Sequence, residues 1–271
     1  MKMNSSLKLA TLAFAAMTLP VNAAHEVIAS SKNPVQPVAA YEGGRGLLTM
    51  EGPSGLFINP TSGTLPAHAF TAQYCFSMPN NDTAVVWHGT MISYGVTDWL
   101  EVGAVFTAFD FDRDVTPASD IAGAGPLVRL RLLKQNGFIP QLSIGGYMRL
   151  GGIESYNAFI ALYERFEISR EGFLQAIGVH AGVRESWKYK GLLDRSDAPV
   201  GYLGLEFQLP YRFYVVGEVS TQDRDSGGDF VPFSAGVQWR AGGVNLSAAF
   251  LNTGLFSEPS FYFGIGSQLK F

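Results

Sequence analysis

The clearest indication of the fold is the sequence FYFGIGSQLKF, residues 261–271. Its large apolar residues stand at every second position, except where Ser267 interrupts the series, and small or polar residues fill the positions between them. Because successive side chains of a β-strand point to opposite faces, this alternation predicts a strand with one apolar and one polar face.

The same period of two recurs upstream, from about Ala67 onward. It predicts about twelve strands, at roughly 67–78, 82–96, 99–109, 123–134, 138–150, 154–167, 172–186, 198–209, 211–222, 229–240, 243–251 and 259–271. Segments 82–96 and 154–167 carry large apolar residues on both faces, so the inward face of these two strands stays ambiguous. Each segment is about long enough to cross a bilayer when tilted.

The composition favours a membrane barrel. Charged residues make up 15% of the 271 residues, hydrophobic residues 47% and aromatic residues 13%, and this is too apolar for a disordered chain. Beyond the N-terminus there is no uninterrupted apolar run of about 18 residues that would form a membrane-spanning helix. We therefore predict an all-β chain forming a transmembrane antiparallel β-barrel of about 12 strands, with a secreted β-sandwich or jelly roll as the alternative.

The N-terminus predicts export. Lys2 and Lys8 precede a short apolar stretch, and Val21 and Ala23 are small residues at the spacing of a cleavage site. Residues 1–23 therefore read as a signal peptide, with a membrane anchor as the alternative. Residues 24–66 are predicted to be a periplasmic lead-in or a lumen plug, and residues 67–271 the transmembrane β-barrel.

The lengths of the connections predict which way the barrel faces. Even-numbered links such as 96–99 and 209–211 are short, whereas several odd-numbered links, including 110–123 and 187–198, are longer and charged. Outer-membrane barrels have short periplasmic turns and longer outer loops. The pattern places both ends of the barrel on the periplasmic side.

The final strand resembles the C-terminal signature of outer-membrane β-barrels of Gram-negative bacteria. The residues that match are Phe263, Ile265, Leu269 and Phe271. The resemblance implies that these residues act as the assembly signal read by the barrel assembly machinery. It also implies that the protein lies in the cell outer membrane, with membrane lipid around it.

A second stretch, residues 52–109, is similar to the start of YjbH-like outer-membrane proteins associated with exopolysaccharide production. The similarity is carried by Gly55-Leu56, Asn59-Pro60-Thr61, Leu65-Pro66 and Phe70. It implies an envelope protein or a polysaccharide as partner. It transfers no catalytic residue.

The chain contains none of the common enzyme motifs, such as G-x-S-x-G, H-E-x-x-H, a P-loop or C-x-x-C. His180 falls on the polar face of its strand and is a hydrated lumen residue or, in the alternative, a general base. Cys75 is the only cysteine, so no internal disulfide is expected. We predict a protein that is not an enzyme, needs no cofactor and, with a net charge of −4, binds no nucleic acid.

Two aspartate clusters are weak candidates for a calcium site, because alternate carboxylates can surround Ca²⁺ with oxygen ligands. Their members are Asp110, Asp112, Asp114, Asp223, Asp225 and Asp229. Arg113 and Arg224 lie within the clusters and can neutralise them, and neither cluster has the full EF-hand pattern. Solvated loop charge is the alternative interpretation.

The alternation also predicts which charges line the lumen. They are Arg129, Arg131, Arg149, Arg184, Glu206 and Glu218. Opposed charges across a lumen set the selectivity of a pore. They favour a channel for small polar solutes, anionic sugars or envelope polysaccharide. Two alternatives remain: Arg–Glu pairs that close a narrow barrel, and a scaffolding barrel that binds an envelope partner through its loops or N-terminal segment.

Overall fold

The computed structural model describes residues 49–50, 55–79, 85–111, 121–190, 199–221, 231–241, 243–253 and 259–270. The predicted signal peptide lies outside these residues. The strands are β1 (Ala69–Pro79), β2 (Val85–Thr97), β3 (Leu100–Phe111), β4 (Ile121–Leu133), β5 (Gln141–Gly151), β6 (Glu154–Glu167), β7 (Ala176–Lys190), β8 (Val200–Gln208), β9 (Phe213–Ser220), β10 (Phe233–Ala241), β11 (Val244–Asn252) and β12 (Ser260–Lys270).

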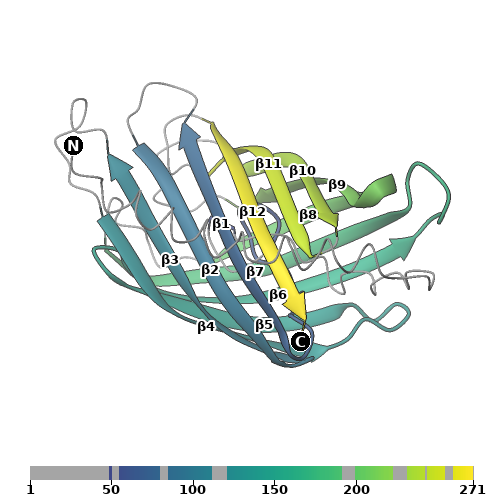
Figure 1. The fold of residues 1–271 in the computed structure, drawn as a ribbon, viewed down its shortest axis with the longest axis horizontal. Helices are drawn as coiled ribbons and strands as arrows, with labels where there is room; N and C mark the ends of the chain where they lie inside the picture. The colour runs from purple at the N-terminus through teal and green to yellow at the C-terminus, as the bar shows by residue number, and fades with distance from the viewer. Residues whose placement is uncertain are drawn as a thin grey trace.

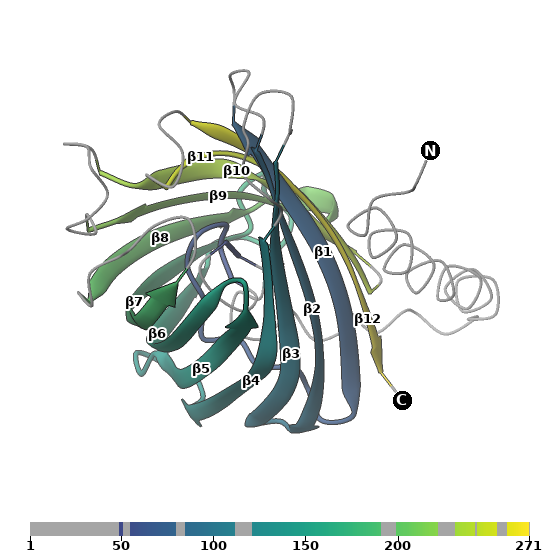
Figure 2. The ribbon, with the colours of Figure 1, turned by 90° about the vertical axis from the view of Figure 1, so that its left-hand side faces the viewer.

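The strands form one closed barrel in which each strand pairs with its sequence neighbours and β1 pairs with β12 (Figures 1 and 2). Every pairing is antiparallel, and the closing register joins Ala69 to Lys270 and Tyr74 to Ile265. Closure leaves no unpaired sheet edge. The predicted all-β antiparallel barrel of about twelve strands is confirmed.

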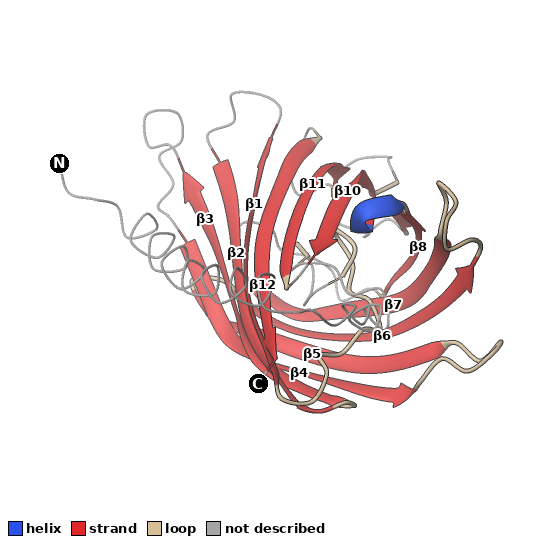
Figure 3. Ribbon diagram, turned by 45° about the vertical axis from the view of Figure 1, so that its right-hand side comes forward, coloured by secondary structure: helices blue, strands red, loops and turns tan. Residues whose placement is uncertain are grey.

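The even-numbered links differ in length: those after β2, β8 and β10 are short turns, whereas those after β4 and β6 span residues 134–140 and 168–175. Thr97 and Leu100 are separated by two residues, and the link between β8 and β9 contains the 3-10 helix η1 (Pro210–Arg212), which is blue in Figure 3. No helix in the described ranges is long and apolar enough to cross a membrane. Five of the six odd-numbered links lie wholly or largely outside the described residues; the link between β5 and β6 is the exception.

The outward face of the barrel is an apolar wall. Its side chains include Val128, Ile160, Leu203, Val215 and Phe263, each at least 40% exposed. Outward positions alternate with buried inward positions along each strand, as the burial pattern of β9 shows. An apolar outer wall around a hydrogen-bonded closed sheet is the arrangement that a hydrocarbon solvent requires.

The inward face departs from the polar face expected from sequence. Trp87 and Met91 on β2 and Phe109 on β3 point inward, where they are buried. They belong to a single apolar cluster that also includes Leu56, Phe57 and Ile58 from the chain before β1. Apolar side chains can face inward here because that preceding segment gives them an apolar partner in place of water.

The start of β1 is fixed where it passes β2. His68 donates a backbone hydrogen bond to the Gly95 oxygen at 2.8 Å. A Cβ built on Gly95 would collide with the Pro66 carbonyl oxygen, whereas one on Gly201 would meet only the Thr221 methyl at 3.6 Å.

We therefore expect Gly95→Ala to lower the free energy of unfolding by about 1–3 kcal/mol, the usual cost of overpacking. Gly201→Ala is the matched control and should leave stability within about 0.5 kcal/mol. Urea unfolding of the protein refolded in detergent measures both. Equal stability of the two variants would contradict the close passage of Pro66 over β2.

Candidate functional site: the barrel lumen

The chain that leads into β1 runs through the inside of the barrel. Residues 49–50 and 55–65, here called the lumen segment, are buried, and Leu56, Asn59 and Leu65 are fully so. In Figure 2 this segment is the dark blue trace inside the ring of strands. The candidate site is therefore the contact between the lumen segment and the inward face of the wall.

The lumen segment folds as a tight loop. Gly55 and Pro60 form an isolated bridge, and the Leu56 amide donates to the Asn59 oxygen at 3.0 Å. A Cβ on Gly55 would collide with that same oxygen, so the close approach requires glycine. The loop thus presents successive amides on one side and carbonyls on the other to the wall.

The carboxylate of Glu218 on β9 binds the tip of this loop. It accepts the backbone N–H groups of Phe57 at 2.8 Å, Ile58 at 2.6 Å and Asn59 at 3.1 Å. The Asn59 side-chain amide and the Ser234 hydroxyl also donate to it, at 2.9 and 2.7 Å. One carboxylate therefore satisfies three consecutive amides that no secondary structure would otherwise satisfy.

A second carboxylate holds the end of the segment near the even-numbered turns. Glu101 on β3 accepts the Leu65 amide at 3.0 Å and the Ser93 hydroxyl at 2.7 Å. Asp98, in the turn between β2 and β3, accepts the Ala67 amide at 2.9 Å. These contacts hold the C-terminal end of the lumen segment against the turn between β2 and β3.

Strands β4–β8 supply donors to the carbonyl side of the loop. Arg129 donates to the Gly63 oxygen, Arg149 to the Met50 oxygen at 3.2 Å, and Arg184 to the Asn59 side-chain oxygen at 2.9 Å. Neutral donors act alongside them. They are Gln141 and Ser143, both to the Ser62 oxygen, at 2.7 and 2.5 Å, and Tyr202 to the Pro60 oxygen at 2.8 Å.

The opposite side of the loop is apolar. Phe57 meets the ring of Tyr262 on β12 edge-on, with centroids 5.6 Å apart. Leu56, Phe57 and Ile58 are part of the cluster that contains Trp87 and Met91. The lumen segment thus accepts hydrogen bonds from β4, β5, β7 and β8, donates to carboxylates on β9 and β3, and packs Phe57 against β12. The Leu56 side chain also lies against Gly204 on β8.

The structure places the predicted lumen charges in three different settings. Arg129, Arg149, Arg184 and Glu218 contact the lumen segment, and all but the half-buried Arg184 are buried. Glu206 instead pairs with Arg240 at 2.5 Å, and Arg240 lies over the Tyr214 ring at 4.1 Å. Arg131 is half-buried near the turn between β2 and β3, where its backbone N–H donates to the Trp99 oxygen. Their role in selectivity stays a prediction.

Sequence reasoning missed two buried charges, Glu101 and Arg240. Both stand on the polar face of an alternating strand, so the same parity that selects Glu218 also selects them. Sequence reasoning also missed the contacts of Asn59, because nothing local indicates that its side chain spans from Glu218 to Arg184.

His180 points inward and is fully buried, with its ring 4.6 Å from the Tyr163 ring. Within the described residues neither of its ring nitrogens has a hydrogen-bond partner. Cys75, on the inward face of β1, is buried, and its thiol donates to the Gly89 oxygen at 3.7 Å. The geometry shows no nucleophile or carboxylate hydrogen-bonded to His180 within the described chain.

The calcium candidates are largely outside the described residues. Asp110 lies near the end of β3, and the other five aspartates fall in ranges that the structure does not describe. Among the residues it does describe, no group of three or more His, Cys, Asp or Glu side chains could hold a metal ion.

Of the predicted assembly signal, Phe263 is exposed on the outer wall, Ile265 and Leu269 are half-buried, and Phe271 is not described.

Comparisons with known proteins bear on the fold. A search of solved structures matches a KdgM porin with a TM-score of 0.51 and 10% sequence identity, over 74% of this chain and 99% of that chain. The chain shares the barrel fold of that porin. No family model matches the sequence, and no curated protein matches it. The similarity of residues 52–109 to YjbH-like proteins therefore stays a prediction.

The contacts of Glu218 predict that the barrel loses stability when this carboxylate is replaced. Glu218→Gln replaces one acceptor oxygen by an N–H₂ group facing buried donors, so we expect a loss of about 1–3 kcal/mol in the free energy of unfolding. Glu167→Gln is the matched control, because Glu167 pairs with Arg165 in an exposed position where an ion pair contributes little. Urea titration of the refolded barrel gives both values, and a Glu218 variant as stable as the control would argue against the Glu218 contacts.

Proposed function

We propose that the protein is a channel of the bacterial outer membrane, closed at rest by its own lumen segment, which acts as a plug. The observation that carries the proposal is the loop of residues 55–65, fully enclosed by a porin-like barrel and held there mainly by hydrogen bonds from the wall. Hydrogen bonds of this kind can be exchanged for bonds to water or solute.

The apolar outer wall supports the membrane location. Residues such as Val128, Leu203 and Val237 are about half-exposed on a closed sheet that has no unpaired edge. Burying such a wall in hydrocarbon satisfies both the apolar side chains and the backbone. The predicted assembly signal at the end of β12 agrees with this location.

The passage opens on the β4–β8 side of the plug. There the wall holds the plug by hydrogen bonds to its carbonyl and amide oxygens and by the contact of Leu56 with Gly204, while its opposite side packs Phe57 against Tyr262. Moving the loop away from β4–β8 costs exchangeable hydrogen bonds, whereas moving it away from β12 would expose apolar surface to water. Small polar solutes, or segments of an envelope polysaccharide rich in acceptor oxygens, can then take over the Arg and Tyr donors.

A disulfide between plug and wall tests the proposal. A Cβ on Gly204 would touch the Leu56 side chain, so these two positions face each other and are the pair at which we would join plug and wall. We expect Leu56→Cys with Gly204→Cys, in a Cys75→Ala background, to abolish conductance in planar bilayers when oxidised. Reduction should restore the openings seen with Cys75→Ala alone.

Each single cysteine variant in the same background controls for the substitutions and should conduct with or without reductant. Replacement of residues 55–63 by a short Gly-Ser linker should give a larger and steadier conductance. Unchanged conductance in the oxidised double variant, with the disulfide verified by mass spectrometry, would refute a moving plug.

The donors on β4–β8 predict anion preference in the open state. Arg149 and Arg184 donate to the plug in the closed state, so they would line the space that the plug leaves when it moves. Replacing both by Gln should shift the reversal potential in a salt gradient towards cations, because rings and rows of charge set pore selectivity. Glu171→Gln, in the exposed turn between β6 and β7, is the control and should leave the reversal potential unchanged.

The apolar packing of Phe57 favours a second candidate, a scaffolding barrel whose plug never leaves. Such a barrel would bind an envelope partner through its loops or N-terminal segment. It predicts no conductance from the reduced double variant or from Cys75→Ala, together with co-purification of a cross-linked envelope protein.

A further inference from the structure

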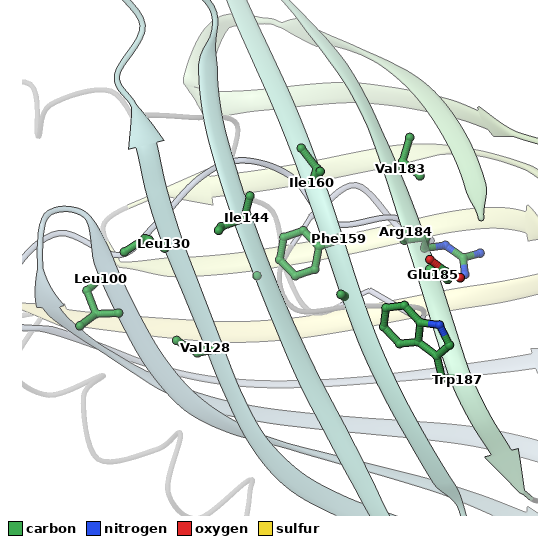
Figure 4. Close-up of a pocket in the computed structure, with 12 residues that line it drawn as sticks. Leu100, Val128, Leu130, Ile144, Phe159, Ile160, Val183, Arg184, Glu185 and Trp187 are labelled. Atoms are coloured by element: carbon green, nitrogen blue, oxygen red, sulfur yellow. The ribbon is translucent and has the colours of Figure 1, made fainter. Parts of the chain in front are cut away.

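His180 is a titratable group inside the barrel that the proposed opening of the channel does not yet use. It stands on β7 with the inward parity of Arg184, and Figure 4 shows that Arg184 and the outward Val183 leave this strand in different directions. The imidazole is fully buried, and within the described residues neither of its ring nitrogens has a hydrogen-bond partner. Buried polar groups without a partner are uncommon in native proteins and call for an explanation.

The wall beside His180 carries no side chain on its β8 side. Gly204 is the residue of β8 that pairs with His180. A Cβ built on Gly204 would collide with the Leu56 side chain, so the plug fills the space that this glycine leaves. Withdrawal of the plug from β4–β8 therefore uncovers a path for water over Gly204 to the imidazole.

The charged groups around His180 are already engaged with other partners. The titratable side chains on the neighbouring inward positions are Tyr163 and Arg165 on β6, Tyr202 and Glu206 on β8, Glu218 on β9 and Arg240 on β10. Residues 55–65 of the plug contribute none. Glu206 is bound to Arg240 at 2.5 Å, and Glu218 accepts the plug amides. An imidazolium at position 180 of the closed channel would therefore be a buried cation without water and without a carboxylate of its own, which is costly.

We propose that His180 makes the channel open in acid: its imidazole binds a proton only when the plug has left β7 and β8 and water reaches the ring. The inference rests on the proposed function, because it needs a plug that moves. A hydrated histidine has an ordinary pKa of about 6.5, so protons bind to the open channel as the pH falls through this value. Because the open state then binds more protons than the closed state, acid shifts the equilibrium towards the open state.

Single-channel recording in planar bilayers measures this shift as the ratio of open to closed time, with the same buffer and salt on both sides of the bilayer. Lowering the pH from about 7.5 to about 5.5 should raise the open-to-closed ratio of the full chain about tenfold, because a hydrated histidine with an ordinary pKa of about 6.5 goes from mostly neutral to mostly protonated over this range.

Two variants remove the proton site in different ways. His180→Phe keeps an aromatic ring against Tyr163, and His180→Gln keeps a polar side chain, but neither binds a proton in this range. Both should respond less than about twofold to the same change of pH. The matched control is His88→Gln, because His88 lies on the outward face of β2, where it is bonded to Tyr74 at 2.8 Å, and this variant should keep the tenfold response. Any response of the carboxylates is common to all of these proteins, so the difference between them isolates His180.

Joining plug to wall tests whether acid acts through the plug. The oxidised Leu56→Cys, Gly204→Cys variant in the Cys75→Ala background should stay closed at both pH values, and its opening in acid would overturn the inference. A tenfold response that survives in both His180 variants, or a parent channel whose open-to-closed ratio is constant or falls in acid, would overturn it too while leaving the channel itself standing. Heat-modifiable migration on a gel verifies that each protein is folded. A folded parent that conducts at neither pH would overturn the proposed function and this inference together.

Discussion

The carboxylate of Glu218 is the group on which the interior of this barrel depends. A chain that crosses a lumen without pairing to a sheet brings its amides and carbonyls into a space with little water, and each must find a partner. Glu218 satisfies the amides of Phe57, Ile58 and Asn59 at once. Because the three amides are consecutive, they can converge on one carboxylate only if the chain turns tightly there, and the Gly55–Pro60 bridge supplies that turn.

The remaining lumen contacts follow from the placement of that turn. With its amides directed to β9, the loop directs its carbonyl side to β4–β8, where Arg129, Gln141 and Tyr202 donate to it. Its apolar side chains then face the sector that contains Trp87 and Tyr262. The inward-facing tryptophan and methionine of β2 would be out of place in an aqueous pore, and they are explained by a loop that covers them.

Much of the barrel could be predicted from the sequence, since alternation depends only on the geometry of a strand. The closing strand, whose predicted range of 259–271 is observed as Ser260–Lys270, and the inward position of Glu218 both follow from parity alone. The inward face of β2 could not be assigned, because Trp87 and Met91 on one face and Ile92 and Tyr94 on the other are equally apolar. Which face turns inward depends on the lumen segment, a partner distant in sequence.

The site was less predictable than the fold for the same reason. Arg129 and Arg149 were expected to line a lumen, and they do point inward, but a pattern within one strand cannot show that their partners are carbonyl oxygens of Gly63 and Met50. Residues 55–65 have no period, because their conformation is set by the wall and not by local propensity. Only Gly55, Asn59 and Pro60 hint at the turn.

Hydrogen–deuterium exchange of the vesicle-inserted protein probes the contacts of Glu218 with the lumen segment, because amides held by buried carboxylates exchange only when those bonds open. We expect peptides covering residues 56–65 to exchange as slowly as the strands of the barrel, and Glu218→Gln to speed exchange at 57–59 while leaving β12 unchanged. Exchange at 57–59 as fast as in an unstructured peptide would contradict a segment held within the lumen.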